Sequence, residues 1–197
     1  MTDFNLDHLW ESEAQEHKAV TEKTFATLQN NFAALLDAAF AAIQSGGKVI
    51  FFGNGGSAAD AQHLATELTI RYKKDRAPIA GLALTTDSSA LTAGGNDMGF
   101  DHIFARQLAA LGKAGDLVIG ISTSGNSANV IEAFKVARAG GMTTVAFTGE
   151  TGGKLNELSD IMLRVPSTTT ARIQEMHIIL GHMLCGGLEQ KLGLVSA

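Results

Sequence analysis

Two residues with reactive side chains, His63 and Glu67, stand four positions apart in a segment with helical periodicity. In an α-helix this spacing places both side chains on one face, about one turn apart. An imidazole and a carboxylate in this arrangement are a plausible metal-binding pair, and equally a plausible hydrogen-bonded pair on a helix surface. The pair alone leaves a functional and a structural interpretation open.

A second group of polar side chains occurs in the predicted last helix, residues 170–193, which is otherwise largely apolar. Because such a helix must bury much of its surface, Gln174, His177 and His182 each need a polar partner. Gln174 and His182 are separated by a rise of about 12 Å on a straight helix. They could share one metal ion if both leaned toward a midpoint, if the helix began after Gln174, or if different subunits contributed to the site. His177 is a rival ligand to His182 on geometry alone.

A third feature is the segment STSGNS, residues 122–127, which follows an apolar run and precedes a helical pattern. Hydroxyl groups, a flexible glycine and the free N–H groups of a helix start meet there. Such a place binds phosphate through hydrogen bonds and the positive end of the helix dipole, without lysine or arginine. A single serine N-cap would not explain four hydroxyl residues in six. We expect a phosphate site, suited to a monophosphate with a polyol tail rather than to a pyrophosphate.

The glycine-rich turn at residues 53–58 matches the G-x-G-x-x-[GA] dinucleotide pattern with Gly53, Gly55 and Ala58. A dinucleotide site also needs an acidic residue at the end of the second strand, roughly 20 residues further on. The nearest candidate at a predicted strand end, Asp87, comes about 30 residues after the turn. This spacing weakens the interpretation as a dinucleotide-dependent oxidoreductase.

Short apolar runs that alternate with helical stretches must position these groups. The runs cover residues 48–53, 79–86, 116–123, 143–149 and 161–166. Their nearly continuous apolar character is typical of strands that are covered on both faces, so we predict an α/β fold with a five-stranded parallel sheet between helices. Ligands bind at the carboxyl ends of the strands in such sheets, where the glycine turn and STSGNS lie.

The N-terminal part, residues 1–45, is predicted to be a helical extension in two segments. No repeat, low-complexity stretch or linker interrupts the chain, so residues 1–197 are predicted to form a single domain. The N-terminal helices could pack on their own domain or on a neighbouring subunit. We favour the neighbour, because long amphipathic helices outside a complete α/β layer need an apolar partner.

Composition excludes several functional classes. The chain has 197 residues, of which 45% are hydrophobic and 18% charged, as expected of a soluble globular protein with a substantial core. A formal charge of −5 argues against a nucleic-acid-binding surface. No run approaches the roughly 18 apolar residues of a membrane span, and the acidic N-terminus does not resemble a signal peptide. We therefore expect neither nucleic acid nor membrane as a partner.

Two local features have simpler interpretations. The single cysteine, Cys185, allows no intrachain disulfide and favours a reducing, cytoplasmic location. Its apolar helical context predicts a buried thiol rather than a nucleophile. The basic run RYKKDR, residues 71–76, predicts a solvated helix end whose cations suit the negative end of the helix dipole, with a supporting role near a bound anion as the alternative.

In combination, the motifs FGNGGSAADAQH, LTTDSS with GNDMGF, GISTSGNSANV and TARIQEMHI with GH resemble those of the phosphoheptose isomerase family. The resemblance covers almost the whole chain from about residue 45. It implies the flavodoxin-like sugar-isomerase (SIS) fold and a homotetramer with active sites at subunit contacts. It also implies conversion of sedoheptulose 7-phosphate to D-glycero-D-manno-heptose 7-phosphate through an enediol, the first step of ADP-heptose synthesis for the lipopolysaccharide core.

The resemblance further implies roles for individual residues. Glu67 and His182 match the family's acid/base pair. One zinc ion per subunit is implied, with the ligands His63, Glu67, Gln174 and His182. The positions that match substrate contacts are Asn54, Gly55, Gly56, Ser57, Glu67, Asn96, Asp97, Ser122, Thr123, Ser124, Ser127 and Gln174. One departure is Gly94, where the family has isoleucine or valine, and we expect it to loosen the packing behind Asn96 and Asp97.

Two alternatives share the same fold. A non-catalytic SIS relative, such as a regulatory tetramer associated with the replication initiator, lacks the reactive carboxylate and the final histidine. Both Glu67 and His182 are present here, which favours an enzyme. An isomerase or sensor for another sugar phosphate would share the phosphate loop and would differ around residues 87–101.

Overall fold

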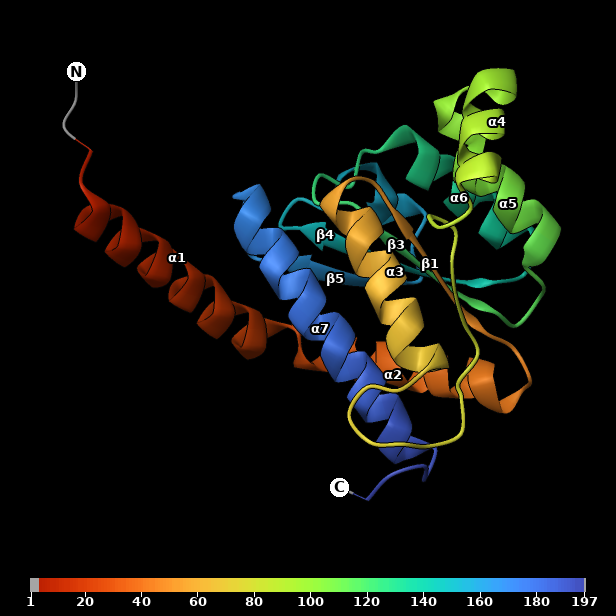
Figure 1. Cartoon of the computed structure of the whole chain (residues 1–197), viewed down its shortest axis with the longest axis horizontal. Coiled ribbons are helices and arrows are strands. Elements are labelled where there is room, and N and C mark those ends of the chain that lie inside the picture. The colour runs from red at the N-terminus through yellow and green to blue at the C-terminus, as the bar shows by residue number, and fades with distance from the viewer. Residues whose placement is uncertain (1–3, 197) are drawn as a thin grey trace.

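The computed structural model describes residues 4–196 and has a five-stranded parallel sheet at its centre (Figure 1). The strands are Val49–Gly53 (β1), Gly81–Ala83 (β2), Leu117–Ile121 (β3), Thr143–Gly149 (β4) and Ile161–Val165 (β5). They pair in the order β2-β1-β3-β4-β5, and every neighbouring pair is parallel. This is the flavodoxin-like order, and it confirms the predicted sheet. β2 is shorter than the predicted run 79–86, because this edge strand pairs with β1 over three residues only.

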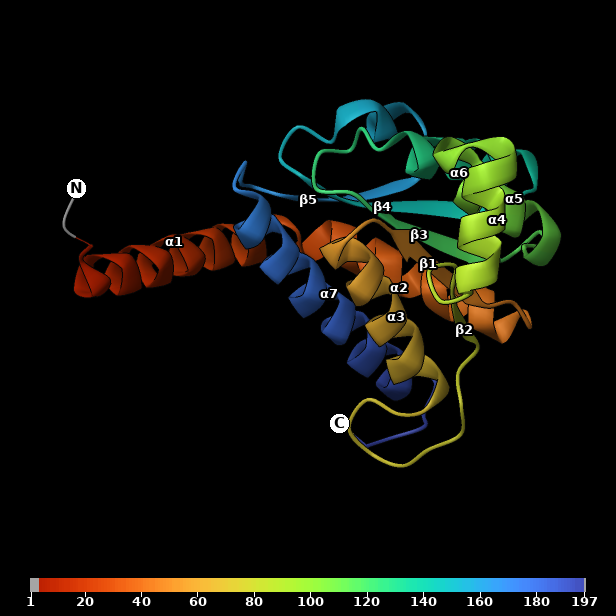
Figure 2. The same cartoon turned by 45° about the horizontal axis from the view of Figure 1, so that its top comes forward.

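Helices lie on both faces of the sheet (Figure 2). They are Leu6–Thr27 (α1), Gln29–Gln44 (α2), Gly56–Thr69 (α3), Ser88–Met98 (α4), Ile103–Leu111 (α5), Ala128–Ala139 (α6) and Thr170–Lys191 (α7), with short 3-10 helices at Phe100–His102 (η1) and Gly153–Glu157 (η2). α2, α3 and α7 share one hydrophobic core with the sheet, and α5 and α6 share the other. Among residues 4–196, no helix has both the length and the apolar character needed to cross a bilayer.

The central strands explain the continuous apolar runs of the sequence. Along β1, Val49 and Phe51 enter the core beneath α2, α3 and α7, whereas Ile50 and Phe52 enter the opposite core. All four side chains are fully buried. Both faces of the strand therefore require apolar residues, as expected for a sheet covered by helices on each side.

The two N-terminal helices behave differently. In α2, Leu35 and Ala39 are fully buried in the core of the chain's own sheet, so the expectation that these helices pack on a neighbouring subunit is wrong for α2. α1 extends away from the sheet (Figure 1), and only Val20 and Thr24 are buried along it. The long helix thus leaves most of its surface uncovered within one chain.

The strand order places the site. Because the chain crosses to opposite faces of the sheet after β1 and after β3, the loops that follow these strands diverge and leave a crevice between them. Asn54, after β1, and Asn129, in the first turn of α6, join the two loops through reciprocal amide hydrogen bonds of 2.9 and 2.8 Å. Gly55 adopts a positive φ of 55° in this turn, a conformation that favours glycine.

Candidate active site

His63 and Glu67 on α3 meet His182 on α7. His63 Nε2 lies 2.8 Å from His182 Nε2 and 3.2 Å from Glu67 Oε1. One nitrogen or oxygen atom of each residue lies within 4.8 Å of the corresponding atoms of the other two. Two imidazoles and a carboxylate are typical zinc donors, so this trio of side chains can hold a metal ion. The structure thus brings together three of the four predicted ligands.

Close packing of α3 and α7 creates the trio. The two helices run side by side in both views (Figures 1 and 2). At Gly181 an added Cβ would lie 2.5 Å from the Cδ atoms of Leu64, so glycine is needed for the helices to approach this closely. His182 is the next residue and reaches the neighbouring α3 face that bears His63 and Glu67. A larger side chain at 181 would have to displace the buried Leu64 side chain or separate the two helices.

The electrostatic environment favours a neutral His182. Partial burial lowers the pKa of this imidazole, and the nearby His63 lowers it further, against the opposing effect of the Glu67 carboxylate. A neutral imidazole is the form that binds a metal ion or accepts a proton. His182 is therefore available for either task near neutral pH.

Two other titratable side chains of α7 are not part of the trio. His177 is fully buried against Phe147, and its Nε2 lies 3.1 Å from the Thr148 carbonyl oxygen. Burial lowers its pKa to about 4. The alternative that His177 is a metal ligand is therefore wrong for this structure. Cys185 is also fully buried, and burial raises the pKa of its thiol to about 12, which confirms the predicted inert thiol.

Gln174, the fourth predicted ligand, lies against the start of α3. An added Cβ at Gly56 would lie 2.2 Å from Gln174 Nε2, so the amide occupies the space that Gly56 leaves open. Gly56 precedes His63 by about two helical turns, or about 10 Å along the axis. The amide of Gln174 thus borders the glycine turn, on the side of the trio that faces the carboxyl ends of the strands.

Asp60 was not predicted from the sequence. On α3 it shares a face with Gly56 and His63 and lies between them. Its side chain is buried, and its Oδ2 atom has no hydrogen-bond partner among the described residues. Burial raises the pKa of this carboxyl to about 6, against a smaller opposing effect of His63. The position three residues before His63 was the only sequence signal that could have indicated it.

A second cluster forms a hydroxyl-lined cavity of about 230 Å³ at the carboxyl ends of β3, β4 and β5. Its lining consists of Thr123, Ser124, Asn126, Gly149, Glu150, Thr151, Ser167, Thr168, Thr170 and Ile173. Of the predicted substrate residues, Thr123 and Ser124 line it directly. Ser122 and Ser127 are not among the lining residues, and their hydroxyl oxygens lie 2.9 Å apart. No lysine or arginine contributes to this lining.

The lining residues between β5 and the start of α7 were not predicted from the sequence. Ser167, Thr168 and Thr170 come from the run STTT, residues 167–170, which leads into the first residue of α7. This run resembles STSGNS in composition and in its position between a strand and a helix. Its hydroxyl content was the signal that could have identified it.

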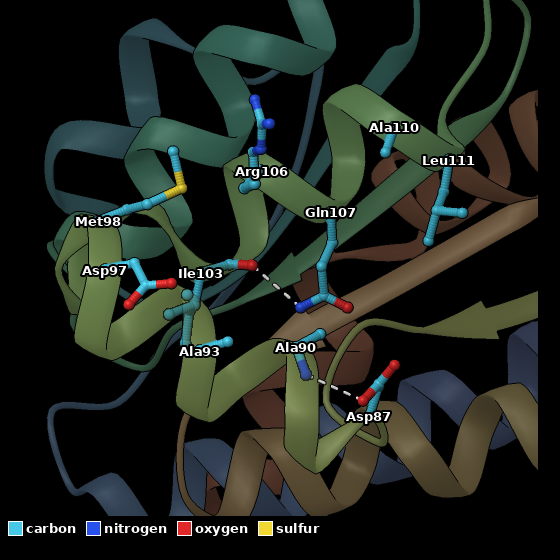
Figure 3. Close-up of a pocket in the computed structure, with 11 residues that line it drawn as sticks. Asp87, Ala90, Ala93, Asp97, Met98, Ile103, Arg106, Gln107, Ala110 and Leu111 are labelled. Atoms are coloured by element: carbon cyan, nitrogen blue, oxygen red, sulfur yellow. Dashed lines mark hydrogen bonds between the residues drawn. The ribbon is translucent and has the colours of Figure 1, made fainter.

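Asn96 and Asp97 lie apart from both clusters. They are exposed on α4, where the Asn96 amide donates a hydrogen bond of 2.7 Å to Asp97 Oδ1. Asp97 lines a separate cavity of about 490 Å³ between α4 and α5 (Figure 3). Gly94 also lines it, and an added Cβ there would make only an ordinary contact of 3.6 Å with Ile103. A side chain at position 94 would therefore fit against Ile103, and the loose packing expected behind Asn96 and Asp97 stays a prediction.

Comparisons with known proteins agree with this architecture. The SIS domain model matches residues 14–149. The phosphoheptose isomerase of Rhodospirillum rubrum is 59% identical over 152 residues, which cover 77% of this chain and 81% of that protein. Solved phosphoheptose isomerases from Neisseria gonorrhoeae and Francisella tularensis superpose with TM-scores of 0.89 and 0.92, at 44% and 36% identity. The matches cover 94% and 95% of this chain and the full length of both structures. The chain therefore belongs to the phosphoheptose isomerase family of sugar-phosphate isomerases, within the SIS fold.

Proposed function

We propose that this isomerase converts sedoheptulose 7-phosphate to D-glycero-D-manno-heptose 7-phosphate, and that it thereby begins ADP-heptose synthesis for the lipopolysaccharide core. The main structural support is that α7 borders both clusters. Ile173 lines the hydroxyl cavity, and His182 joins the trio about 13 Å further along the helix. This separation suits an extended sugar chain with a phosphate at one end and a carbonyl at the other.

The phosphate end would occupy the hydroxyl cavity. Thr123 and Ser124 offer hydroxyl donors there, and α6 begins just beyond their loop. Hydroxyl donors, free backbone N–H groups and the positive helix end hold a phosphate without a cationic side chain. Asn54, Gly55, Gly56, Ser57 and Gln174 would contact the sugar between the two clusters, and Asn96 and Asp97 would contact it only if α4 approached the crevice or a neighbouring subunit contributed them.

Glu67 and His182 would carry the proton transfers. Aldose–ketose isomerisation moves a proton between C1 and C2 through an enediol, while the two oxygens exchange a second proton. Glu67 would remove the proton from one carbon and return it to the other. His182 would transfer the proton between the oxygens. The side chain of Glu67 is 17% exposed, so little water competes for its carboxylate.

The trio also fits a zinc ion, and we infer one ion per subunit. His63, Glu67 and His182 would hold it, and Gln174 would complete the set by turning its amide from Gly56 toward the trio. When bound, zinc supplies a Lewis acid that stabilises negative charge on the substrate oxygens. Because one carboxylate is unsuited to be a tight ligand and a free base at once, Glu67 would leave the ion during turnover or the ion would mainly organise the site. Elemental analysis of the purified protein tests this inference, and a fully active metal-free enzyme would contradict it.

A homotetramer with sites at subunit contacts is part of the same proposal, as is a cytoplasmic location. α1 supports the assembly, because it carries large exposed apolar side chains that a neighbouring subunit would cover. Those on α1 are Leu6, Leu9, Trp10 and Phe25, together with Phe4 just before it. The single cysteine supports the reducing compartment.

The direct test is turnover of defined ketose phosphates. The purified protein is incubated with sedoheptulose 7-phosphate and, separately, with shorter ketose phosphates, and formation of the aldose is followed. We expect rapid conversion of the seven-carbon substrate and slow conversion of the shorter ones. Tight binding without turnover would instead favour a non-catalytic SIS protein, and preference for a shorter sugar would favour another isomerase.

A further inference from the structure

The loop after α3 is attached to α7 by a buried ion pair. Arg76 Nε lies 2.8 Å from Glu189 Oε1, and the two side chains are only 1% and 2% exposed. The solvated helix end predicted for the basic run is therefore wrong for Arg76. A buried charge is tolerated only when it is paired and fully hydrogen-bonded, so this ion pair fixes the loop on α7.

The two residues of this ion pair also fix the end of α3 and the start of the loop. Arg76 Nη2 donates a 2.7 Å hydrogen bond to the carbonyl of Glu67, and Nη1 donates one of 2.8 Å to the carbonyl of Leu68. Glu189 Oε1 accepts a 3.1 Å hydrogen bond from the backbone N–H of Tyr72. The position of Tyr72 relative to α7 is thus determined by buried polar contacts.

Tyr72 places its ring on His182. The ring centroids are 5.5 Å apart with an interplanar angle of 26°, which is a stacked geometry. His182 also meets His63, with ring centroids 5.0 Å apart and an interplanar angle of 72°. Gly186, one helical turn after His182, leaves room for this stack, because an added Cβ there would lie 3.1 Å from Tyr72 Cε1.

Stacking has a specific consequence for an imidazole. Rotation of a histidine ring about χ2 is soft, with broad minima rather than sharp ones. His182 is only partly buried, so its ring orientation is set by the side chains that touch it. We propose that Tyr72, held in place by the Arg76–Glu189 ion pair, is a positioning residue that fixes the ring orientation of His182 in the trio.

This inference rests on the role proposed for His182 in proton transfer. Loss of the stack should lower kcat and leave the KM for the sugar phosphate nearly unchanged, because the hydroxyl cavity is remote from Tyr72. The ring, not the hydroxyl group, makes the contact. Within residues 4–196 no hydrogen bond of the Tyr72 hydroxyl is found, so phenylalanine should replace tyrosine.

The experiment compares Tyr72→Leu and Tyr72→Phe in the full-length protein. We expect Tyr72→Leu to lower kcat by about 10- to 100-fold, as for a small misplacement of a reacting group. Tyr72→Phe should retain most of the wild-type kcat. Lys74→Ala is the matched control, because Lys74 lies in the same loop, is exposed and contacts Ser196 rather than the trio. Thermal unfolding verifies that each variant is folded.

A second readout is independent of activity. The ring-proton NMR signals of His182 in the metal-free protein, assigned by their loss in His182→Gln, should lie upfield in the wild type and in Tyr72→Phe, and move downfield in Tyr72→Leu. Wild-type kcat in Tyr72→Leu, or unchanged His182 signals in that variant, would overturn the inference. If the wild type itself fails to isomerise sedoheptulose 7-phosphate, the proposed function fails and the NMR comparison alone decides the role of Tyr72.

Discussion

The trio and the hydroxyl cavity differ in both chemistry and construction. The trio is built of titratable side chains, and His63 and His182 lie 119 positions apart in the sequence, on different helices. The cavity is lined mainly by neutral hydroxyl groups from loops that follow neighbouring strands. Because no lysine or arginine lines the cavity, its binding groups bring no fixed positive charge near the trio. The side chains of the trio are therefore free to exchange protons. Changes in the trio should therefore affect kcat, and changes in the cavity should affect KM.

The largest effect is expected for Glu67→Gln. Glutamine keeps the shape of the side chain but does not accept the proton from the sugar carbon, so kcat should fall by about 10²- to 10⁴-fold. KM should change little, because the phosphate contacts remain. Steady-state kinetics measure both constants, and circular dichroism verifies the fold. Near-normal turnover by this variant would refute the assignment of the base.

The complementary change in the cavity is Ser124→Ala. Loss of one hydrogen bond to a charged phosphate should weaken binding by about 1.5–3 kcal/mol, and so raise KM by about 10- to 100-fold. The value of kcat should remain close to that of the wild type. Ser12→Ala on α1 is the control, since Ser12 is exposed and bonds only to the Leu9 carbonyl. A fall in kcat with unchanged KM would remove the distinction between the two clusters.

His177 and His182 lie on the same helix, but only His177 is fully buried. Its pKa is about 4 in the fold and near 6.5 when unfolded, so below pH 6.5 the unfolded chain binds a proton that the folded chain excludes. The free energy of unfolding of the metal-free protein should carry a His177 contribution of about 3 kcal/mol that is lost as pH falls from 6.5 to about 4. Denaturant titrations across this range measure it. In His177→Gln, which retains a donor for Thr148, this loss should disappear, and its persistence would contradict the account.

The smallest effect is expected for Asp60. Its contribution to the free energy of unfolding changes with pH in the opposite direction to that of His177. Its folded pKa of about 6 lies above the ordinary carboxyl value of 3.8, so between these values the folded chain binds the extra proton and stability falls as pH rises. Asp60→Asn removes this unfavourable contribution, and at pH 7 the metal-free variant should be more stable by on the order of 1 kcal/mol, after allowance for solvent screening. At pH 3.5 the two proteins should have similar stability. Denaturant titrations at both pH values test this, and a less stable variant at pH 7 would show that the carboxylate has a partner.

The two clusters also differ in how far sequence could predict them. STSGNS is contiguous and follows a strand, so its place at the carboxyl edge of the sheet follows from the apolar pattern alone. The trio depends on how α3 and α7 pack. Gly181 permits this packing, but a glycine at this position does not predict it from the sequence. For the same reason helix spacing alone could not decide between His177 and His182, or place Gln174 on Gly56. The stack of Tyr72 on His182 depends on a buried ion pair between residues 113 positions apart, for which the sequence holds no local signal.

The most direct test of the central claim is a crystal structure of Glu67→Gln with sedoheptulose 7-phosphate bound. The account predicts that the phosphate contacts Thr123 and Ser124 in the hydroxyl cavity, and that C1 and C2 lie within reach of residues 67 and 182. A phosphate bound elsewhere, for example between α4 and α5, or a sugar whose carbonyl end points away from the trio, would contradict it.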